Sequence, residues 1–285
     1  MNFPIPFTKM SGTGNDFIVI DHRQPLIPEN EQASFARQVC RRMFAAGADG
    51  LILIEASATA DFSWRFYNAD GSLAEMCGNG ARCAARFAFE RGIAGRTMRF
   101  ETLAGIIKAE IIDGLGPDRH EVSLLMTAPF DMRRDLTVTL DGQNKTVQFM
   151  NSGVPHAILF IDKGEDFPLK KWGRAIRMHK MFQPAGTNAN FVQVLGDNTI
   201  RVRTYERGVE DETMACGTGA VASAIFATMA GHTVSPVRVI TSGGDQLTIR
   251  FDLTIDSNTT RADQVFLEGP ARIIYEGQLT AEALR

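Results

Sequence analysis

The sequence has little of what marks a membrane, secreted or metal-binding protein. Its longest apolar window, Ala220–Ala230, is too short to cross a bilayer and consists largely of alanine, so we expect no membrane span. The first residues include neither a basic nor an apolar segment, so we expect no signal peptide. The four cysteines form no CxxC pair and none of the five histidines clusters beside them, which excludes the usual zinc-ligand spacings. We therefore expect a cytoplasmic protein with reduced thiols and no metal site.

An excess of charge of either sign is also absent. Lys and Arg total 30 and Asp and Glu total 33, so the formal net charge is −3. This near balance gives no long-range attraction for nucleic acid or for an anionic membrane, and we expect neither as a partner. With 44% hydrophobic and 22% charged residues, the 285-residue chain has the composition of a folded globular protein. Its length fits one large domain or two of about 130 to 150 residues.

The sequence does contain an internal repeat. Residues 77–81 read Cys-Gly-Asn-Gly-Ala and residues 216–220 read Cys-Gly-Thr-Gly-Ala, and each segment leads into an Ala-rich helix that ends at a glycine. Ser11-Gly12 recurs as Ser152-Gly153 at nearly the same separation, followed in each case by a strand-like run. Two blocks repeated in the same order indicate a gene duplication that produced two similar lobes.

The two copies predict an α+β fold in which each lobe is a curved, mostly antiparallel sheet around a central helix, with the active site in the cleft between the lobes. We expect an N-terminal lobe over 1–118, completed by the tail at about 273–285, and a C-terminal lobe over 119–272, with a linker at 113–118. The expected helices are 31–44, 81–91, 168–178 and 220–230. The expected strands are 17–20, 51–54, 62–67, 121–127, 136–140, 145–149, 157–161, 191–195, 199–205 and 265–275.

The repeated cysteines are the strongest chemical signal. A thiol at the start of a helix lies near unpaired N–H groups and a partial positive charge, which favour the thiolate, and the same N–H groups can hold a carboxylate. One such cysteine is more often a packed residue than a catalyst, but two at equivalent places fit a single reaction. One thiolate would remove a proton from one face of a carbon and the other thiol would return a proton to the opposite face. Cys77 and Cys216 are therefore the predicted acid–base pair of a racemase or epimerase that needs no pyridoxal phosphate, and Cys40 and Cys83 are predicted to be structural.

Several motifs resemble those of the diaminopimelate epimerase family. They span nearly the whole chain: Lys9–Phe17, Asn68–Ser72, Met76–Cys83, Gly153–His156, Gly186–Asn188, Tyr205–Gly208, Ala215–Gly219 and Leu267–Ala271. Members of this family interconvert LL- and meso-2,6-diaminopimelate with two cysteines and without cofactor or metal, on a route to lysine and peptidoglycan precursors. The resemblance therefore implies an isomerase with diaminopimelate as its small-molecule partner. It also implies a homodimer, which is common in the family.

The resemblance also implies roles for individual residues. Cys77 and Cys216 match the catalytic pair, and His156 and Glu206 match groups that tune the pKa values of the thiols. The residues that match the substrate-binding set are Asn15 near the reacting carbon, Gly78, Asn79, Gly217 and Thr218 at its carboxylate, and Asn68, Asn188, Glu206 and Arg207 at the distal end. An arginine suits a distal carboxylate because its planar guanidinium binds both oxygens.

Three positions depart from many family members. Ser11 replaces a histidine, Gly50 replaces a glutamine that binds substrate in some relatives, and Val154 replaces an asparagine that helps hold the distal carboxylate. Neither Gly50 nor Val154 can supply the missing amide, so the details of polar contact are expected to differ.

Two other functions remain as alternatives. A proline or hydroxyproline epimerase, or a broader amino-acid racemase, uses the same pair of cysteines, but its substrate has no second amino-acid end to engage Glu206 and Arg207. A non-catalytic amino-acid-binding protein is the alternative from another class. A thiol-redox protein is disfavoured because the cysteines lack CxxC spacing.

Overall fold

Internal contacts divide the chain into two units. The computed structural model describes residues 1–113, 120–162, 164, 166–256 and 260–285. Unit 1 comprises residues 1–124 and 269–285, and unit 2 comprises residues 125–268. These boundaries differ from the predicted 118/119 and 272/273 by a few residues. The first lies later than predicted because the strand expected at 121–127 belongs mainly to unit 1. Apart from Asp113, the predicted linker lies outside the described residues.

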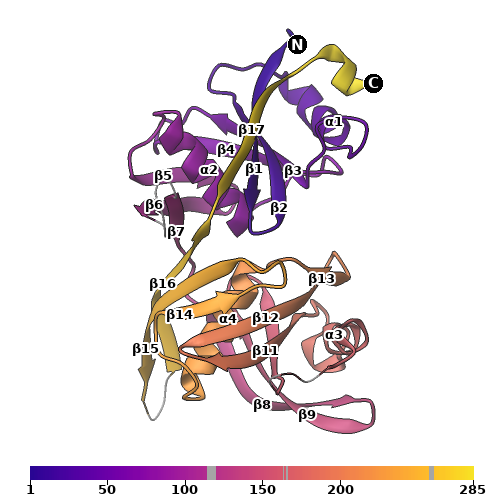
Figure 1. Cartoon of the computed structure of the whole chain (residues 1–285), viewed down its shortest axis with the longest axis vertical. Helices are drawn as coiled ribbons and strands as arrows, with labels where there is room; N and C mark the ends of the chain where they lie inside the picture. The colour runs from indigo at the N-terminus through magenta and orange to yellow at the C-terminus, as the bar shows by residue number, and fades with distance from the viewer. Residues whose placement is uncertain (114–119, 163, 165, 257–259) are drawn as a thin grey trace. The chain divides into compact units, whose positions relative to one another are not determined.

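Unit 1 is built on a sheet that includes both ends of the chain (Figure 1). Its elements are β1 (Ile5–Gly12), β2 (Asn15–Asp21), α1 (Glu29–Val39), β3 (Gly50–Glu55), β4 (Phe62–Asn68), α2 (Gly78–Glu90), β5 (Thr97–Thr102), β6 (Gly105–Asp113), β7 (His120–Leu125), β17 (Arg272–Leu279) and the 3-10 turn η2 (Ala281–Leu284). Strand β17 pairs antiparallel with β1, and this pairing holds the C-terminal tail in unit 1.

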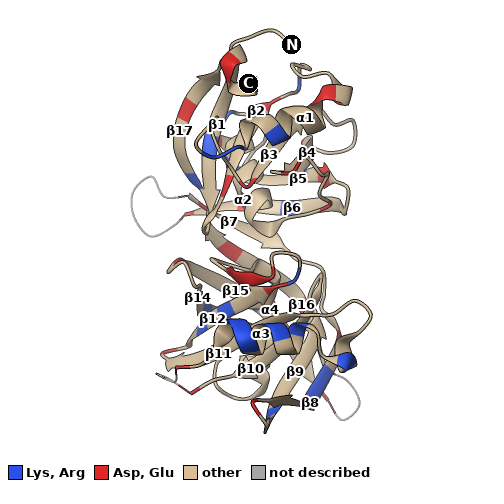
Figure 2. Ribbon diagram, turned by 90° about the vertical axis from the view of Figure 1, so that its right-hand side faces the viewer, with Lys and Arg blue, Asp and Glu red and all other residues tan. Residues whose placement is uncertain are grey.

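Unit 2 repeats this plan within one continuous stretch of chain. Its elements are β8 (Phe130–Leu140), β9 (Gln143–Asn151), β10 (Pro155–Phe160), α3 (Leu169–Arg177), the 3-10 turn η1 (Lys180–Phe182), β11 (Asn188–Gly196), β12 (Thr199–Glu206), β13 (Asp211–Thr213), α4 (Gly217–Met229), β14 (Val237–Ile240), β15 (Gln246–Ile255) and β16 (Thr260–Pro270). Helix α3 packs Trp172 and Ile176 against the core, and its exposed side carries Lys170, Lys171 and Arg174, blue in Figure 2.

The order of strand pairing is the same in both units. In unit 1, β2 pairs parallel with β3 and β4 with β5, while β3/β4 and β5/β6 are antiparallel. In unit 2, β10 pairs parallel with β11 and β12 with β14, while β11/β12 and β14/β15 are antiparallel. Each parallel pair is joined through a helix, as a parallel crossover requires. The prediction of two similar α+β lobes, each with a mostly antiparallel sheet, is confirmed.

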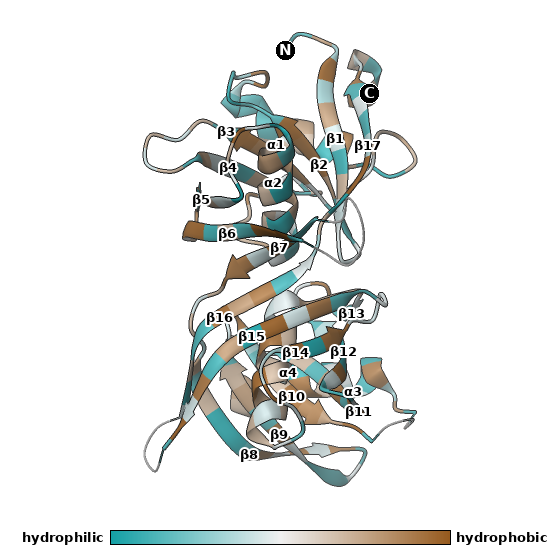
Figure 3. Ribbon diagram, turned by 60° about the vertical axis from the view of Figure 1, so that its left-hand side comes forward, coloured by the Kyte–Doolittle hydropathy of each residue, from teal (hydrophilic) through white to brown (hydrophobic). Residues whose placement is uncertain are grey.

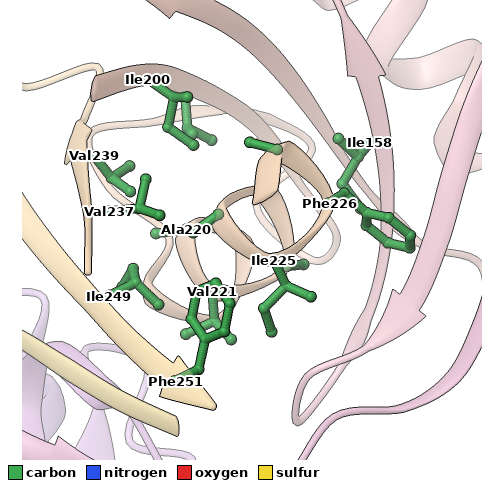
Figure 4. Close-up of a cluster of buried hydrophobic side chains, with 14 of the residues drawn as sticks. Ile158, Ile200, Ala220, Val221, Ile225, Phe226, Val237, Val239, Ile249 and Phe251 are labelled. Carbon is green, nitrogen blue, oxygen red and sulfur yellow. The ribbon is translucent and has the colours of Figure 1, made fainter. Parts of the chain in front are cut away.

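Each unit encloses a largely buried helix that carries one copy of the repeated motif. In unit 2, Val221, Ile225 and Phe226 of α4 pack against hydrophobic side chains of the surrounding strands (Figure 4). In unit 1, α2 buries most of its residues, and the neighbouring β3 is hydrophobic from Leu51 to Ile54, brown in Figure 3. Both helices end before a glycine with positive φ, Gly92 at 63° and Gly231 at 75°. These stops follow the local end signals in the sequence.

Helix α1 ends five residues earlier than the apolar spacing indicated. It stops at Val39, and Met43, expected on its buried face, is fully exposed with φ of 69°. The N–H of Gly47 bonds back to the carbonyl of Val39, and Arg42 is held by ion pairs to Asp16 and Asp49. These contacts bend the chain out of the helix toward β3, and they outweigh the periodicity of one apolar side chain.

Gly50 is required by packing, which accounts for one departure from the family pattern. A Cβ at this position would lie 2.5 Å from Cε2 of Phe66 and 2.7 Å from the carbonyl oxygen of Tyr67. Gly50→Ala is therefore expected to lower the free energy of unfolding by about 1–3 kcal/mol, as overpacking does. Urea unfolding measures the change. Gly95→Ala is the matched control, since a Cβ there meets nothing within 4 Å; equal stability of the two variants would contradict the steric explanation.

Candidate active site

The two repeated cysteines occupy the same structural position in their units. Cys77 and Cys216 are the N-cap residues of α2 and α4, both extended and half-buried, with φ/ψ of −147°/118° and −123°/107°. The N–H of Gly80 points at Sγ of Cys77 at 3.4 Å. Each thiol therefore adjoins the free N–H groups and positive end of a buried helix, the setting that favours a thiolate and binds a carboxylate.

The other two cysteines have a different environment. Cys40 and Cys83 are buried, and burial raises the pKa of each thiol to about 12. A thiol that stays protonated and shielded from solvent is a poor base. This supports the prediction that Cys40 and Cys83 are structural.

In unit 1, a network of amides orients the residues beside Cys77. Nδ2 of Asn79 donates to Oδ1 of Asn15 at 2.7 Å, and Nδ2 of Asn15 donates to Oδ2 of Asp49 at 3.0 Å. Oδ1 of Asn79 accepts from Oγ1 of Thr13 at 3.0 Å and from Nη2 of the fully buried Arg82 at 2.9 Å. Asn15, expected to bind substrate, therefore keeps one amide hydrogen for that purpose.

A charged cluster behind Asn15 keeps Asp49 in place. Nη2 of Arg42 bonds Oδ1 of Asp16 at 2.5 Å and Oδ1 of Asp49 at 2.9 Å, and Nζ of Lys9 lies 2.7 Å from Oδ2 of Asp16. Burial acts to raise the pKa of Asp16, but hydrogen bonds from Arg42 and Lys9 outweigh it and lower that pKa to about 2. Asp16 therefore stays ionised at neutral pH, and Arg42 links it to Asp49, whose carboxylate keeps the amide of Asn15 in one orientation.

In unit 2, a chain of hydrogen bonds runs inward from Cys216. Sγ of Cys216 lies 3.6 Å from Oγ1 of Thr218, which lies 2.9 Å from Nε2 of His156. Nδ1 of His156 in turn accepts from Nδ2 of Asn190 at 3.0 Å. His156 is fully buried, and burial together with the charge of Arg207 lowers its pKa to about 3. The imidazole is therefore neutral, and the hydroxyl of Thr218 lies between it and the thiol of Cys216.

Three of the four residues expected at the distal end of the substrate lie together in unit 2. Oδ1 of the buried Asn188 accepts from the backbone N–H of Arg207 at 2.7 Å, and Nη1 of Arg207 donates to the carbonyl of Ala185 at 2.9 Å. Oε2 of Glu206 accepts from Oγ1 of Thr213 at 2.8 Å, three residues before Cys216. The fourth residue, Asn68, lies in unit 1 at the exposed end of β4 and donates to Oγ of Ser72 at 3.0 Å.

Burial raises the pKa of Glu206 above its ordinary value. Below that ordinary value the carboxyl is protonated in both the folded and the unfolded chain, and as the pH rises the unfolded chain ionises first, so the free protein loses stability. Glu206→Gln should therefore raise the melting temperature at pH 7 by a few degrees, with the gain shrinking toward pH 4, while activity falls. Thermal unfolding across this range is the measurement. A gain that is constant with pH would show that ionisation of Glu206 is not its cause.

The structure adds residues that were missed in the sequence. Asn190 and Thr204 support His156, Asp49 supports Asn15, and Oγ of Ser152 donates to the carbonyl of Thr218 at 2.8 Å. One signal was available for Asn190, because residues two apart on a strand point to the same face and Asn188 was already a candidate. Thr204 and Asp49 carry no comparable local signal.

Among residues 1–113, 120–162, 164, 166–256 and 260–285, no helix is long and apolar enough to span a membrane. Within the same described residues, no group of three or more His, Cys, Asp or Glu side chains is arranged to hold a metal ion.

Comparison with solved structures supports the fold. The chain resembles a PhzF-family phenazine biosynthesis protein from Bacillus anthracis, with a TM-score of 0.71 at 15% identity over 98% of this chain and 100% of the other. It also resembles a hydroxyproline epimerase from Agrobacterium vitis, with a TM-score of 0.69 at 17% identity over 98% of this chain and 93% of the other. At such identities the likeness concerns the fold alone.

Sequence comparison is more specific. The family model described as diaminopimelate epimerase matches residues 7–128 and 148–273. A diaminopimelate epimerase from Aquifex aeolicus is 46% identical over 98% of this chain and 99% of its own length. One from Archaeoglobus fulgidus is 42% identical over 99% of this chain and 98% of its own length. The sequence-based prediction of an isomerase of this kind is confirmed: the chain belongs to the diaminopimelate epimerase family.

Proposed function

We propose that this protein interconverts LL- and meso-2,6-diaminopimelate by moving the α-proton between Cys77 and Cys216, without cofactor, on a route to lysine and peptidoglycan precursors. The observation that carries the proposal is the presence, in each unit, of a half-buried thiol at the N-cap of a buried helix. One such thiol could be incidental; two at equivalent positions match the needs of a reaction that inverts one carbon. The cytoplasmic location and the homodimer remain predictions.

The reaction needs one acid and one base on opposite faces of the α-carbon. The thiolate of one cysteine takes the α-proton and becomes a thiol, and the electron pair of the broken C–H bond stays on the substrate. The thiol of the other cysteine then gives its proton to the opposite face and becomes a thiolate. The reverse reaction exchanges the two roles, so charge and protons balance in both directions.

Substrate binding follows from the groups that each site leaves available. The N–H groups at Gly78–Asn79 and Gly217–Thr218 open helices α2 and α4 and suit the carboxylate at the reacting carbon. At the distal amino-acid end, Arg207 suits the carboxylate and Glu206 suits the ammonium, with Asn188 and Asn68 as further polar contacts. Val154 has no side-chain amide, so the distal carboxylate has one polar contact fewer than in relatives that carry asparagine there.

The decisive experiment is incubation of the reduced protein with LL-diaminopimelate in deuterium oxide. Formation of the meso isomer together with deuterium at the α-carbon supports the proposal, and a protein that binds the amino acid without exchange would be a binding protein. The solved hydroxyproline epimerase of similar fold justifies L-proline and trans-4-hydroxy-L-proline as parallel substrates. Turnover of either at a rate comparable to that of diaminopimelate would favour the proline-type alternative.

Activity should persist after dialysis against a chelator. Loss of activity on dialysis and its restoration by added metal would contradict a mechanism that relies on thiols alone.

A further inference from the structure

The orientation of the Asn190 side chain is determined by its neighbours. Its Nδ2 lies 3.1 Å from the carbonyl oxygen of Ala157 and 3.0 Å from Nδ1 of His156, while its Oδ1 accepts from the hydroxyl of Thr204 at 2.9 Å. A carbonyl oxygen can only accept, so the atom that faces Ala157 must be the amide nitrogen. Asn190 is fully buried, and water therefore offers no alternative partner.

This orientation determines the tautomer of His156. An amide nitrogen can only donate, so Nδ1 of His156 is the acceptor and carries no proton. In a neutral imidazole the proton then lies on Nε2, which donates to Oγ1 of Thr218 at 2.9 Å. Because that oxygen accepts the hydrogen bond from Nε2, the hydroxyl hydrogen of Thr218 points away from His156. Sγ of Cys216 lies 3.6 Å from the same oxygen.

The glycine that follows Thr218 allows helix α4 to pack closely against Asn190 and His156. A Cβ at Gly219 would lie 2.3 Å from Oδ1 of Asn190 and 3.3 Å from Cε1 of His156. At the matching position in unit 1, a Cβ at Gly80 would make only ordinary contacts of 3.4 Å or more. The second glycine of the motif is thus required in unit 2 by the close approach of Asn190, not by the turn alone.

We propose that Asn190 is a positioning residue that holds His156 as the Nε2–H tautomer, so that the hydroxyl of Thr218 donates its hydrogen bond to Cys216 and favours the thiolate. This inference rests on the proposed function, since it concerns how one of the two thiols is readied for proton transfer. Asn190 touches neither the thiol nor the substrate-binding residues named above; it acts through His156 and Thr218.

The first test observes the tautomer directly and needs no substrate. In protein labelled with ¹⁵N-histidine, the His156 signals, assigned by their loss in His156→Gln, should show a protonated Nε2 and a bare Nδ1 at neutral pH. Asn190→Leu removes the amide donor and should populate both tautomers. A wild-type proton on Nδ1, or an unchanged tautomer in Asn190→Leu, would overturn the proposal. A wild-type protein that fails to epimerise diaminopimelate would overturn the proposed function alone.

The second test measures whether the effect passes through Thr218. Asn190→Leu should lower kcat/KM by about 10- to 100-fold, the effect of losing one hydrogen bond to a charged group. The loss should fall on kcat rather than KM, and the acid limb of the pH profile should move to higher pH. The groups that face the His156 ring are Thr218 from α4 and Asn190 from β11, with the charge of Arg207 acting from beyond the end of β12. Once Thr218→Val has removed the hydroxyl that links His156 to Cys216, adding Asn190→Leu should not lower kcat/KM further. Additive losses would overturn the proposal.

Three further variants guard against a loss of folding. Thr204→Val removes only the hydroxyl that holds Oδ1 of Asn190, and it should reduce kcat/KM a few-fold in the same direction, whereas Thr204→Ser should restore it. Gln193→Leu is the matched control, because Gln193 lies on the same strand but bonds the carbonyl of Asp162, away from the thiol. It should retain wild-type kinetics; a loss in Gln193→Leu equal to that in Asn190→Leu would show that any change in β11 is harmful and would overturn the assignment.

Discussion

Replacement of Cys77 or of Cys216 by alanine is expected to abolish epimerisation of diaminopimelate. Each face of the reacting carbon needs its own proton donor or acceptor, and a positioned acid or base contributes about 10²- to 10⁴-fold to the rate. Neither helix offers a second thiol at its N-cap, because Cys83 lies inside α2, six residues after Cys77, and burial raises the pKa of its thiol to about 12. The measurement is conversion of LL- to meso-diaminopimelate by each variant under reducing conditions.

The other two cysteines provide the matched controls. Cys40→Ala and Cys83→Ala remove thiols of the same size that burial keeps protonated, so both variants should retain activity if they fold. Circular dichroism and thermal unfolding establish the fold of all four proteins. An active Cys77→Ala or Cys216→Ala enzyme would end the two-base mechanism, whereas inactivity of all four folded variants would indicate a general sensitivity to cysteine loss.

Arg207→Met is expected to produce the second large loss, in turnover of diaminopimelate. The guanidinium of Arg207 donates to the carbonyl of Ala185, and the backbone N–H of Arg207 donates to Oδ1 of Asn188. The side chain is therefore held in place before substrate binds. Methionine keeps the length of the side chain but leaves the distal carboxylate without its partner, and a site built to pair a polar group discriminates by about 10⁴- to 10⁵-fold against its absence. We therefore expect kcat/KM to fall by several orders of magnitude.

An arginine on β12, the strand that leads to Arg207, serves as the control. Arg201 of β12 is exposed, and Arg201→Met should leave turnover close to that of the wild type. Substrate analogues supply the converse test: L-lysine and L-proline lack the distal carboxylate and should be rejected by the wild-type enzyme. Comparable turnover of L-lysine and diaminopimelate would show that Arg207 does not select the distal end and would indicate a broader amino-acid racemase.

The sequence by itself was sufficient to locate the two thiols and the fold class. Cys77 and Cys216 are each followed by a glycine turn and an Ala-rich helix that ends at a glycine, and these signals act over a few residues. Helix starts and stops depend on such local backbone chemistry. The burial of α4 follows from its apolar composition. The repeat then predicted two lobes of one plan, which the matching order of strand pairing confirms.

Only the tertiary structure decided what supports the site residues. The bond from Asn190 to His156 and the bond from Asp49 to Asn15 each join residues 34 positions apart in the chain. Parallel pairing of β10 with β11 and of β2 with β3 sets these distances, and a parallel register is determined by packing across the sheet and the crossover helix rather than by neighbouring residues. Contacts outside the helix also ended α1 at Val39, where ion pairs from Arg42 to Asp16 and Asp49 outweighed local periodicity.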